Sequence, residues 1–280
     1  MNKLKKVGLT ALATTLVASS AYAGEMSVSG SASLNYSGIS TNSNVNPWTM
    51  GDSVTFSGGG DLDNGMTVSV SYELDGGNYD DYSLNLGLGD GMGTVTFSGA
   101  SVNAGGVDKV KDIIPTAYTP VYENTNTVDN GLATTSGRST ASMWGYNYSN
   151  GGLMVSLGYN KLNSDAGQDA ESSIGVSFDA MDGLTVAAGT MDDGVVSEND
   201  TYGIKYVAGA FTAGYQITKI DYDSTATADQ DARHYAISYA VNDDLSVSYG
   251  QQIVDISGAA NDEENSGFSA SYTMGSISLG

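Results

Sequence analysis

MSVSGSASLNY, residues 26–36, places Met, Val, Gly, Ala, Leu and Tyr at even positions and Ser or Asn at odd positions. A strict period of two is typical of a β-strand, because successive side chains point to opposite faces of a sheet. An amphipathic helix would instead repeat its apolar residues every three to four positions. The segment therefore predicts a strand with one apolar and one polar face.

The same alternation recurs along the whole chain. Fifteen segments show it: 26–36, 54–58, 66–74, 82–88, 95–99, 144–148, 153–159, 174–178, 184–188, 202–206, 211–217, 235–239, 245–249, 268–272 and 277–279. Their polar positions carry mostly Ser, Thr, Asn and Gly, whereas their apolar positions carry Leu, Val, Ala, Gly and many Tyr. The chain is therefore expected to be all-β.

The connections between these segments alternate in length. The short ones are rich in Asp, Asn and Gly, as tight hairpins require, and lie at 61–65, 89–93, 149–152, 179–183, 207–210, 241–244 and 274–275. The longer ones lie at 38–49, 75–80, 101–139, 163–171, 192–200, 223–233 and 253–265. This alternation predicts that neighbouring strands are antiparallel and that all the long loops emerge at one end.

Composition excludes several classes of protein. The 280 residues include 37 Gly, 3 Pro, no Cys, and 32 acidic against 10 basic residues, for a formal net charge of −22. Pro is too scarce for collagen or a Pro-rich disordered chain, and the absence of Cys excludes disulfides, thiolate metal sites and a cysteine nucleophile. The acidic balance argues against a nucleic-acid partner, which needs Lys and Arg to neutralise phosphates.

The N-terminal segment has the layout of a secretory signal peptide. Lys3, Lys5 and Lys6 precede an apolar stretch at 7–18, and the small-residue triplet Ala-Tyr-Ala follows at 21–23. The apolar stretch is shorter than the roughly 20 residues of a membrane-spanning helix, so cleavage is favoured over a membrane anchor. We expect residues 1–23 to be removed on export and residues 24–280 to form the mature barrel.

Two architectures fit an all-antiparallel sheet: a soluble sandwich or propeller, and a closed membrane barrel. Small Ala and Gly residues on the apolar face would underfill a soluble core, whereas lipid tails impose no volume to match. Tyrosines near strand ends fit the aromatic girdles of a membrane barrel and occur at Tyr36, Tyr72, Tyr148, Tyr159, Tyr206 and Tyr239. The sequence therefore predicts a transmembrane antiparallel up-and-down β-barrel.

The strand count predicts a larger barrel than the segments alone provide. Bacterial single-chain barrels have even strand numbers, and a barrel must close because unpaired backbone groups are costly in lipid. The fifteenth segment is still in progress at Gly280. We therefore expect 16 strands in the full-length protein, about 15 of them present here, with the C-terminal strand missing.

The layout resembles the sixteen-stranded general porins of alphaproteobacteria, the Rhodobacter type. The similar features are EMSVSG at 25–30, IIP at 113–115, VDI at 254–256 and SGFSASY at 266–272, together with the order and lengths of the strands and loops. The resemblance implies an outer-membrane channel of a Gram-negative bacterium for the passive diffusion of small hydrophilic solutes and ions. It also implies a homotrimer surrounded by outer-membrane lipid, with the long connection 101–139 folding inward to constrict the pore.

The charged residues of this loop and of the polar faces predict the selectivity of the pore. The constriction residues would be Asp108, Lys109, Lys111, Asp112, Glu123, Asp129 and Arg138, and the charged wall residues would be Glu73, Asp81 and Lys205. The polar faces of the first four strands carry no Arg or Lys, unlike the basic cluster usual in the family. Because acidic linings favour cations, we expect a channel that prefers cations and small neutral solutes. The alternative is that the acidic loops merely face water and bind divalent ions.

Two other functions are alternatives to a diffusion channel. One is a plugged outer-membrane barrel with a binding or structural role, which the small Ser-rich lining disfavours. The other is a barrel hydrolase, whose Ser-His-Asp arrangement would have to be built on His234, the sole histidine. His234 follows Arg233 at the start of a strand and is expected to be a solvated rim residue. We therefore expect no enzymatic activity and no catalytic residue.

The sequence requires no cofactor, although calcium is a possible ligand. Asp61, Asp63 and Gly65 imitate part of a calcium loop, but the expected downstream Glu is missing. Calcium between the acidic outer loops at 75–81 or 192–200 is more plausible, because clustered carboxylates repel one another unless a cation bridges them. The ligands themselves cannot be assigned from the sequence.

Overall fold

A computed structural model describes residues 26–36, 48–76, 78–100, 104–115, 143–161, 169–194, 197–225, 227–274 and 277–279. The signal peptide expected at 1–23 lies outside these residues. No helix in the described ranges is long and apolar enough to cross a membrane. The elements are β1(Met26–Tyr36), β2(Trp48–Asp61), β3(Thr67–Asp75), β4(Asn78–Gly87), β5(Thr94–Ala100), the 3-10 helix η1(Gly106–Lys109), β6(Met143–Asn150), β7(Leu153–Asn160), β8(Glu171–Met181), β9(Leu184–Asp192), β10(Ser197–Ala208), β11(Phe211–Tyr222), β12(Gln230–Ala240), β13(Leu245–Ile256), β14(Glu263–Met274) and β15(Ile277–Leu279).

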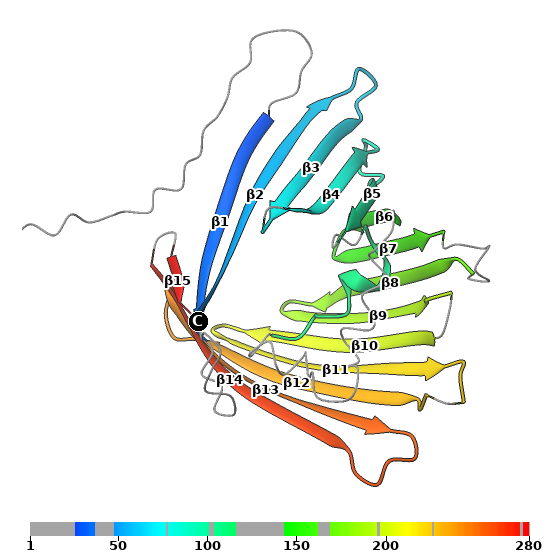
Figure 1. Cartoon of the computed structure of the whole chain (residues 1–280), viewed down its shortest axis with the longest axis vertical. Helices are drawn as coiled ribbons and strands as arrows, with labels where there is room; N and C mark the ends of the chain where they lie inside the picture. Colours follow the sequence, from blue (N-terminus) through cyan, green and yellow to red (C-terminus); the bar gives the residue numbers. More distant parts are fainter. Residues whose placement is uncertain are drawn as a thin grey trace, which may run out of the picture.

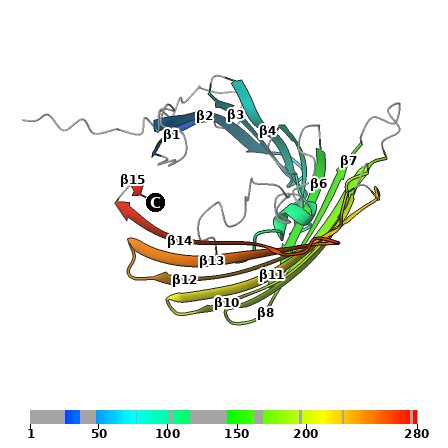
Figure 2. The same cartoon turned by 60° about the horizontal axis from the view of Figure 1, so that its bottom comes forward.

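All fifteen predicted strands are confirmed, and they form one sheet. The strands follow one another in chain order, β1 to β15, and each is antiparallel to its neighbours. The sheet curls around a central space, so that β14 and β15 come back toward β1 (Figures 1 and 2). The fold is therefore the antiparallel up-and-down β-barrel that the sequence predicts.

The strict alternation of long and short connections is wrong in two places. The predicted long connection 75–80 is a tight one, because β3 ends at Asp75 and β4 begins at Asn78. Similarly, β9 continues to Asp192 and β10 begins at Ser197, inside the predicted loop 192–200. Backbone pairing can continue where the apolar alternation stops, because ladder hydrogen bonds do not depend on side-chain polarity. The sequence pattern therefore predicts loops at these polar strand ends.

The outward face of the sheet is apolar. Ile237 and Phe268, on β12 and β14, are 57% and 66% exposed. Outward aromatic residues gather near the short connections, where the rings of Phe211 and Tyr239 lie with their centroids 4.5 Å apart. An exposed apolar face bordered by aromatic residues is the outer surface of a membrane barrel.

Outward charged residues on β11 and β12 lie toward the opposite end of the barrel, nearer the longer connections. Lys219 on β11 pairs with Asp231 on β12 at 3.4 Å, and Arg233 pairs with Asp262 at 3.6 Å. Charges are costly against lipid but not in water or among head groups. These pairs therefore mark where this part of the outer surface leaves the hydrocarbon.

The principal buried apolar cluster lies inside the barrel. It consists of Val107 and Val110, from the connection between β5 and β6, and Ala187 and Met191, from the inward face of β9. In a soluble sandwich the corresponding cluster would lie between two sheets. Here the strands turn their apolar faces outward, so the enclosed apolar contacts come from a segment packed against the inner wall.

Candidate functional site

Residues 104–115, referred to below as the lumenal segment, lie inside the barrel. They belong to the connection between β5 and β6 and contain η1. Figure 2 shows η1 within the curve of the sheet, on the concave side of the strands that follow β6. The segment therefore occupies the space through which a solute would pass.

A row of glycines on the inner wall receives the lumenal segment. Each glycine takes an inward position on one of six successive strands, β6 to β11; we call this row the glycine track: Gly145, Gly158, Gly175, Gly189, Gly203 and Gly214. A Cβ added to Gly175 would lie 2.6 Å from the carbonyl oxygen of Gly106. A Cβ on Gly189 would lie 2.8 Å from Val110 Cγ2. Such distances are shorter than van der Waals contact, so the close approach requires glycine.

The far end of the lumenal segment packs against the same track through two isoleucines. An added Cβ on Gly203 would lie 2.6 Å from Ile113 Cδ1, and one on Gly214 would lie 2.6 Å from Ile114 Cγ2. Ile114 is buried, although it is part of a connection between strands. The removal of this apolar surface from water stabilises the inward position of the segment.

A polar anchor holds the beginning of the lumenal segment. The Asn147 side-chain amide on β6 donates to the carbonyl oxygen of Ala104 at 2.8 Å. The Ser156 hydroxyl on β7 donates to Asn147 Oδ1 at 2.6 Å and accepts from the Gly106 backbone N–H at 2.7 Å. These bonds satisfy backbone groups that the packing removes from water, which would otherwise destabilise the segment.

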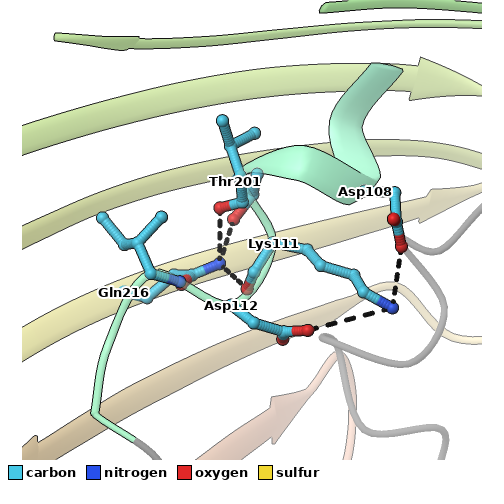
Figure 3. A network of polar contacts seen from close by, with 7 residues as sticks. Asp108, Lys111, Asp112, Thr201 and Gln216 are labelled. Atoms are coloured by element: carbon cyan, nitrogen blue, oxygen red, sulfur yellow. Dashed lines mark hydrogen bonds and ion pairs between the residues drawn. The ribbon is translucent and has the colours of Figure 1, made fainter. Parts of the chain in front are cut away.

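A second anchor holds the end of the segment and is built on Gln216 of β11 (Figure 3). The Gln216 side-chain amide donates to Thr201 Oγ1 at 2.7 Å and to the carbonyl oxygen of Lys111. Gln216 Oε1 accepts from the backbone N–H of Ile113 at 3.3 Å. One buried side chain thus bonds to both a carbonyl and an N–H of the segment, which fixes its register on the wall.

Between the two anchors the segment presents charged groups. Lys111 Nζ lies 3.1 Å from an oxygen of Asp108 and 3.9 Å from one of Asp112, and Figure 3 shows the ammonium between the two carboxyl groups. Two carboxylates share one ammonium, so these three residues carry a net charge of −1 when all are ionised. Lys109 is exposed and has no ion pair with the residues that the structure describes.

The pKa of the Asp112 carboxyl is raised. The Asp112 side chain is 57% exposed, but the segment and the surrounding wall remove part of its hydration. This desolvation is the largest cause of the raised pKa, which Lys111 lowers and Asp108 raises further. Asp112 therefore takes up a proton at a higher pH than an ordinary aspartate.

The predicted wall residues lie on different strands. Register places Lys205 on β10 opposite Thr185 and Gly214, Glu73 on β3 opposite Thr55, and Asp81 on β4 opposite Ala100. Lys205 is thus next to the glycine track, whereas Glu73 and Asp81 belong to the part of the wall before β5. Glu123, Asp129 and Arg138, predicted for the constriction, lie outside the described residues.

His234 is not the solvated rim residue that the sequence suggested. It is fully buried on the inward face of β12, in register with Gln216 on β11 and Gln252 on β13. The outward alternation Tyr235, Ile237 and Tyr239 begins one residue later, which places His234 on the inner wall. Both register partners are amides, so strand register gives no support to a Ser-His-Asp arrangement.

Within the described residues, no group of three or more His, Asp or Glu side chains is placed to hold a metal ion. Calcium at 75–81 or 192–200 therefore stays a prediction without assigned ligands.

Sequence reasoning missed the glycine track and both anchors. The glycines occupy polar-face positions of six strands in succession, where small residues are ordinary in a pore lining. The available signal was the recurrence of an inward glycine in each of these strands, and only strand register shows that the glycines adjoin one another. Gln216 and Asn147 stood out no more than other polar residues on the same faces.

Sequence and structure comparisons identify the family. The model of the Gram-negative porin family matches residues 8–277, so the chain belongs to this family. It is an outer-membrane channel protein for the passive diffusion of small hydrophilic solutes. No curated protein matches the sequence at a significant level.

Several solved porins share the fold. A porin refined at 1.8 Å resolution is 17% identical with a TM-score of 0.65, over 90% of this chain and 91% of that one. A multiple mutant of the Rhodopseudomonas blastica porin is 17% identical with a TM-score of 0.62, over 89% and 90% of the two chains. An anion-selective porin from Comamonas acidovorans is 13% identical with a TM-score of 0.65, over 90% and 86%. These similarities establish the fold alone.

Proposed function

We propose that this porin prefers cations and that the connection 101–139 constricts its channel. The observation that carries the proposal is the position of the lumenal segment inside the barrel, with Asp108 and Asp112 sharing Lys111. The formal net charge of −22 acts in the same direction, because an acidic lumen attracts cations and repels anions. Glu123, Asp129 and Arg138 are proposed to complete the constriction, with Glu73, Asp81 and Lys205 on the wall.

Reversal potentials across a planar bilayer test the preference. With the full chain inserted and a KCl gradient applied, we expect a potential of the sign that cation permeation produces. The double variant Asp108→Asn, Asp112→Asn should move this potential toward zero, whereas Asp231→Asn, on the outward face, should not. A potential of the anion-selective sign in the unaltered protein would overturn the proposal.

The proposed assembly is a homotrimer in the outer membrane, reached after cleavage of residues 1–23. On the outward face of β1 and β2, small residues would permit close approach of a second barrel: Gly30, Ala32 and Gly58. Conductance steps grouped in threes, and a trimer by mass measurement in detergent, are expected. Gly30→Trp should shift the protein toward monomers, whereas a trimer unaffected by that bulk would place the contact elsewhere.

A plugged barrel is the second candidate, because part of the lumen is filled. Gln216, His234 and Gln252 form a row across β11, β12 and β13, and all three are fully buried. A barrel filled across its whole width would give no stable conductance steps in the bilayer. Steps of constant size would reject this candidate.

A further inference from the structure

One side of the lumen carries an open recess that is distinct from the acidic part of the lumenal segment. It has a volume of about 520 Å³, and its lining comes from β4 to β7 and from the two residues of the lumenal segment that border it, Ala104 and Lys109. This volume falls within the range of small-molecule sites. Asn147 and Ser149, near the end of β6, place the recess toward the short connections, which face the periplasm in such barrels.

The lining is unusual for this acidic chain. Among the described residues, no Asp or Glu lines the recess, and Lys109 is the single charged residue that does. The carboxylates of Asp108 and Asp112 are instead engaged with Lys111. The recess is therefore a local site of positive charge in an otherwise acidic protein.

Several hydrogen-bond donors of the recess have no acceptor among the described residues. Asn85 accepts from the Thr96 hydroxyl at 2.7 Å, and Asn147 is occupied by Ala104 and Ser156. In contrast, the hydroxyls of Ser83, Thr94 and Ser149 make no side-chain hydrogen bond with the described part of the chain, and neither does the Lys109 ammonium. With respect to the described residues, one ammonium and three hydroxyls are thus available to bind a ligand.

We propose that this recess binds a small hydroxylated anion, of the sugar-acid type, during passage through the channel. The Lys109 ammonium would pair with the carboxylate, and the Ser83, Thr94 and Ser149 hydroxyls would bond to the hydroxyl groups of the solute. The proposal rests on the proposed water-filled channel. It assigns to the lumen a solute-binding site that retains one class of anion against the general charge of the protein.

Block of the channel current by gluconate tests the proposal. The unaltered full chain is held in a bilayer at constant KCl concentration, and gluconate, hexanoate or sorbitol is added. Hexanoate has the carboxylate without the hydroxyls, and sorbitol has the hydroxyls without the carboxylate. We expect saturable block by gluconate at a concentration at least about fivefold lower than for either analogue, since loss of one or more hydrogen bonds weakens binding by such factors.

The variant Lys109→Gln should raise the half-blocking concentration of gluconate about tenfold, as expected for loss of a charge-assisted bond. Lys219→Gln is the matched control, because it removes the same positive charge from the outward face of the barrel. The double variant Ser83→Ala, Ser149→Ala should reduce the preference for gluconate over hexanoate while leaving conductance steps intact. This variant retains the charge and gives a second readout if Lys109→Gln does not assemble.

The two proposals fail in different ways. An absence of conductance steps would remove the channel itself, and with it the basis of this site. Steps without saturable gluconate block, equal block by gluconate and hexanoate, or equal effects of Lys109→Gln and Lys219→Gln would overturn the recess while leaving the channel in place.

Discussion

At Gly214 the inner wall carries no side chain, and Ile114 occupies the space where one would be. The same relation holds for Val110 above Gly189 and for Ile113 above Gly203. The lumenal segment therefore packs closely on the wall for two reasons: the wall has no side chains at these positions, and the segment supplies apolar side chains. Such close packing is sensitive to the addition of even a few atoms.

Gly214→Val and Ala213→Val place the same side chain on opposite faces of β11. The inward valine would meet Ile114, including its Cα at 2.9 Å from the new Cβ, so the segment must move toward the axis of the lumen. We expect Gly214→Val to lower single-channel conductance and to reduce the free energy of unfolding by about 1–3 kcal/mol. Ala213→Val points outward and should change neither quantity measurably. Equal conductance for the two variants would show that the segment does not depend on this contact.

The raised pKa of Asp112 gives a pH dependence with a defined sign. Because its pKa in the folded protein lies above the ordinary value of 3.8, Asp112 is neutralised before an ordinary aspartate as the pH falls. Cation preference should therefore begin to decline above the ordinary aspartate range, and the decline should be smaller in Asp112→Asn. The contribution of Asp112 to stability is fully present below its pKa in the unfolded chain and is lost as the pH rises through its pKa in the folded protein. Reversal potentials measured against pH, with Asp231→Asn as the control, check this expectation.

Among the elements, the strands were the most predictable part of the molecule. Period-two alternation located all fifteen, because a wall between lipid and water imposes opposite polarities on its two faces. The ends were less predictable: β10 begins at Ser197, ahead of the predicted segment 202–206, in a stretch whose two strand faces are both polar. Outside the hydrocarbon a strand no longer needs an apolar face, so the alternation of polarity ends before the backbone pairing does.

The site was less predictable than the fold, for a reason that lies in strand register. Asp108, Lys111 and Asp112 could be proposed because charged residues in the longest connection stand out in the sequence. The glycine track cannot be read in the same way, since adjacency between Gly175 and Gly189 depends on how two strands are paired. His234 shows the same dependence, because a shift of one position separates a solvated residue from a buried inward one.

The assignment of the two strand faces predicts opposite responses on β12. Ile237→Lys would place an ammonium among the lipid-facing residues between Tyr235 and Tyr239, whereas Ser238→Lys would place it on the inner wall. We expect the outward lysine to reduce the free energy of unfolding in lipid by about 2–4 kcal/mol, the cost of a lysine near the bilayer midplane. The inward lysine should instead shift the reversal potential toward anions with a smaller loss of stability. Unfolding in lipid vesicles measures the first effect, and a larger loss for Ser238→Lys would invert the face assignment.

For the whole molecule, the excess of 32 acidic over 10 basic residues predicts a selectivity that depends on salt. The screening length is about 3 Å in 1 M salt and about 30 Å in 0.01 M salt. Charges distant from the permeating ion therefore act on it only when salt is dilute. We expect the ratio of cation to anion permeability to rise as ionic strength falls. A ratio independent of salt would assign selectivity to contacts at the constriction alone.

The glycine track also has a mechanical consequence. Through it, the lumenal segment braces six adjacent strands, β6 to β11, from the inside, while the strands from β1 to β4 have no such brace among the described residues. A cylinder stiffened on one side does not deform evenly under lateral pressure. Compression by the surrounding membrane should therefore flatten this barrel first along β1 to β4, so that its bore would change shape on one side while the braced side keeps its curvature.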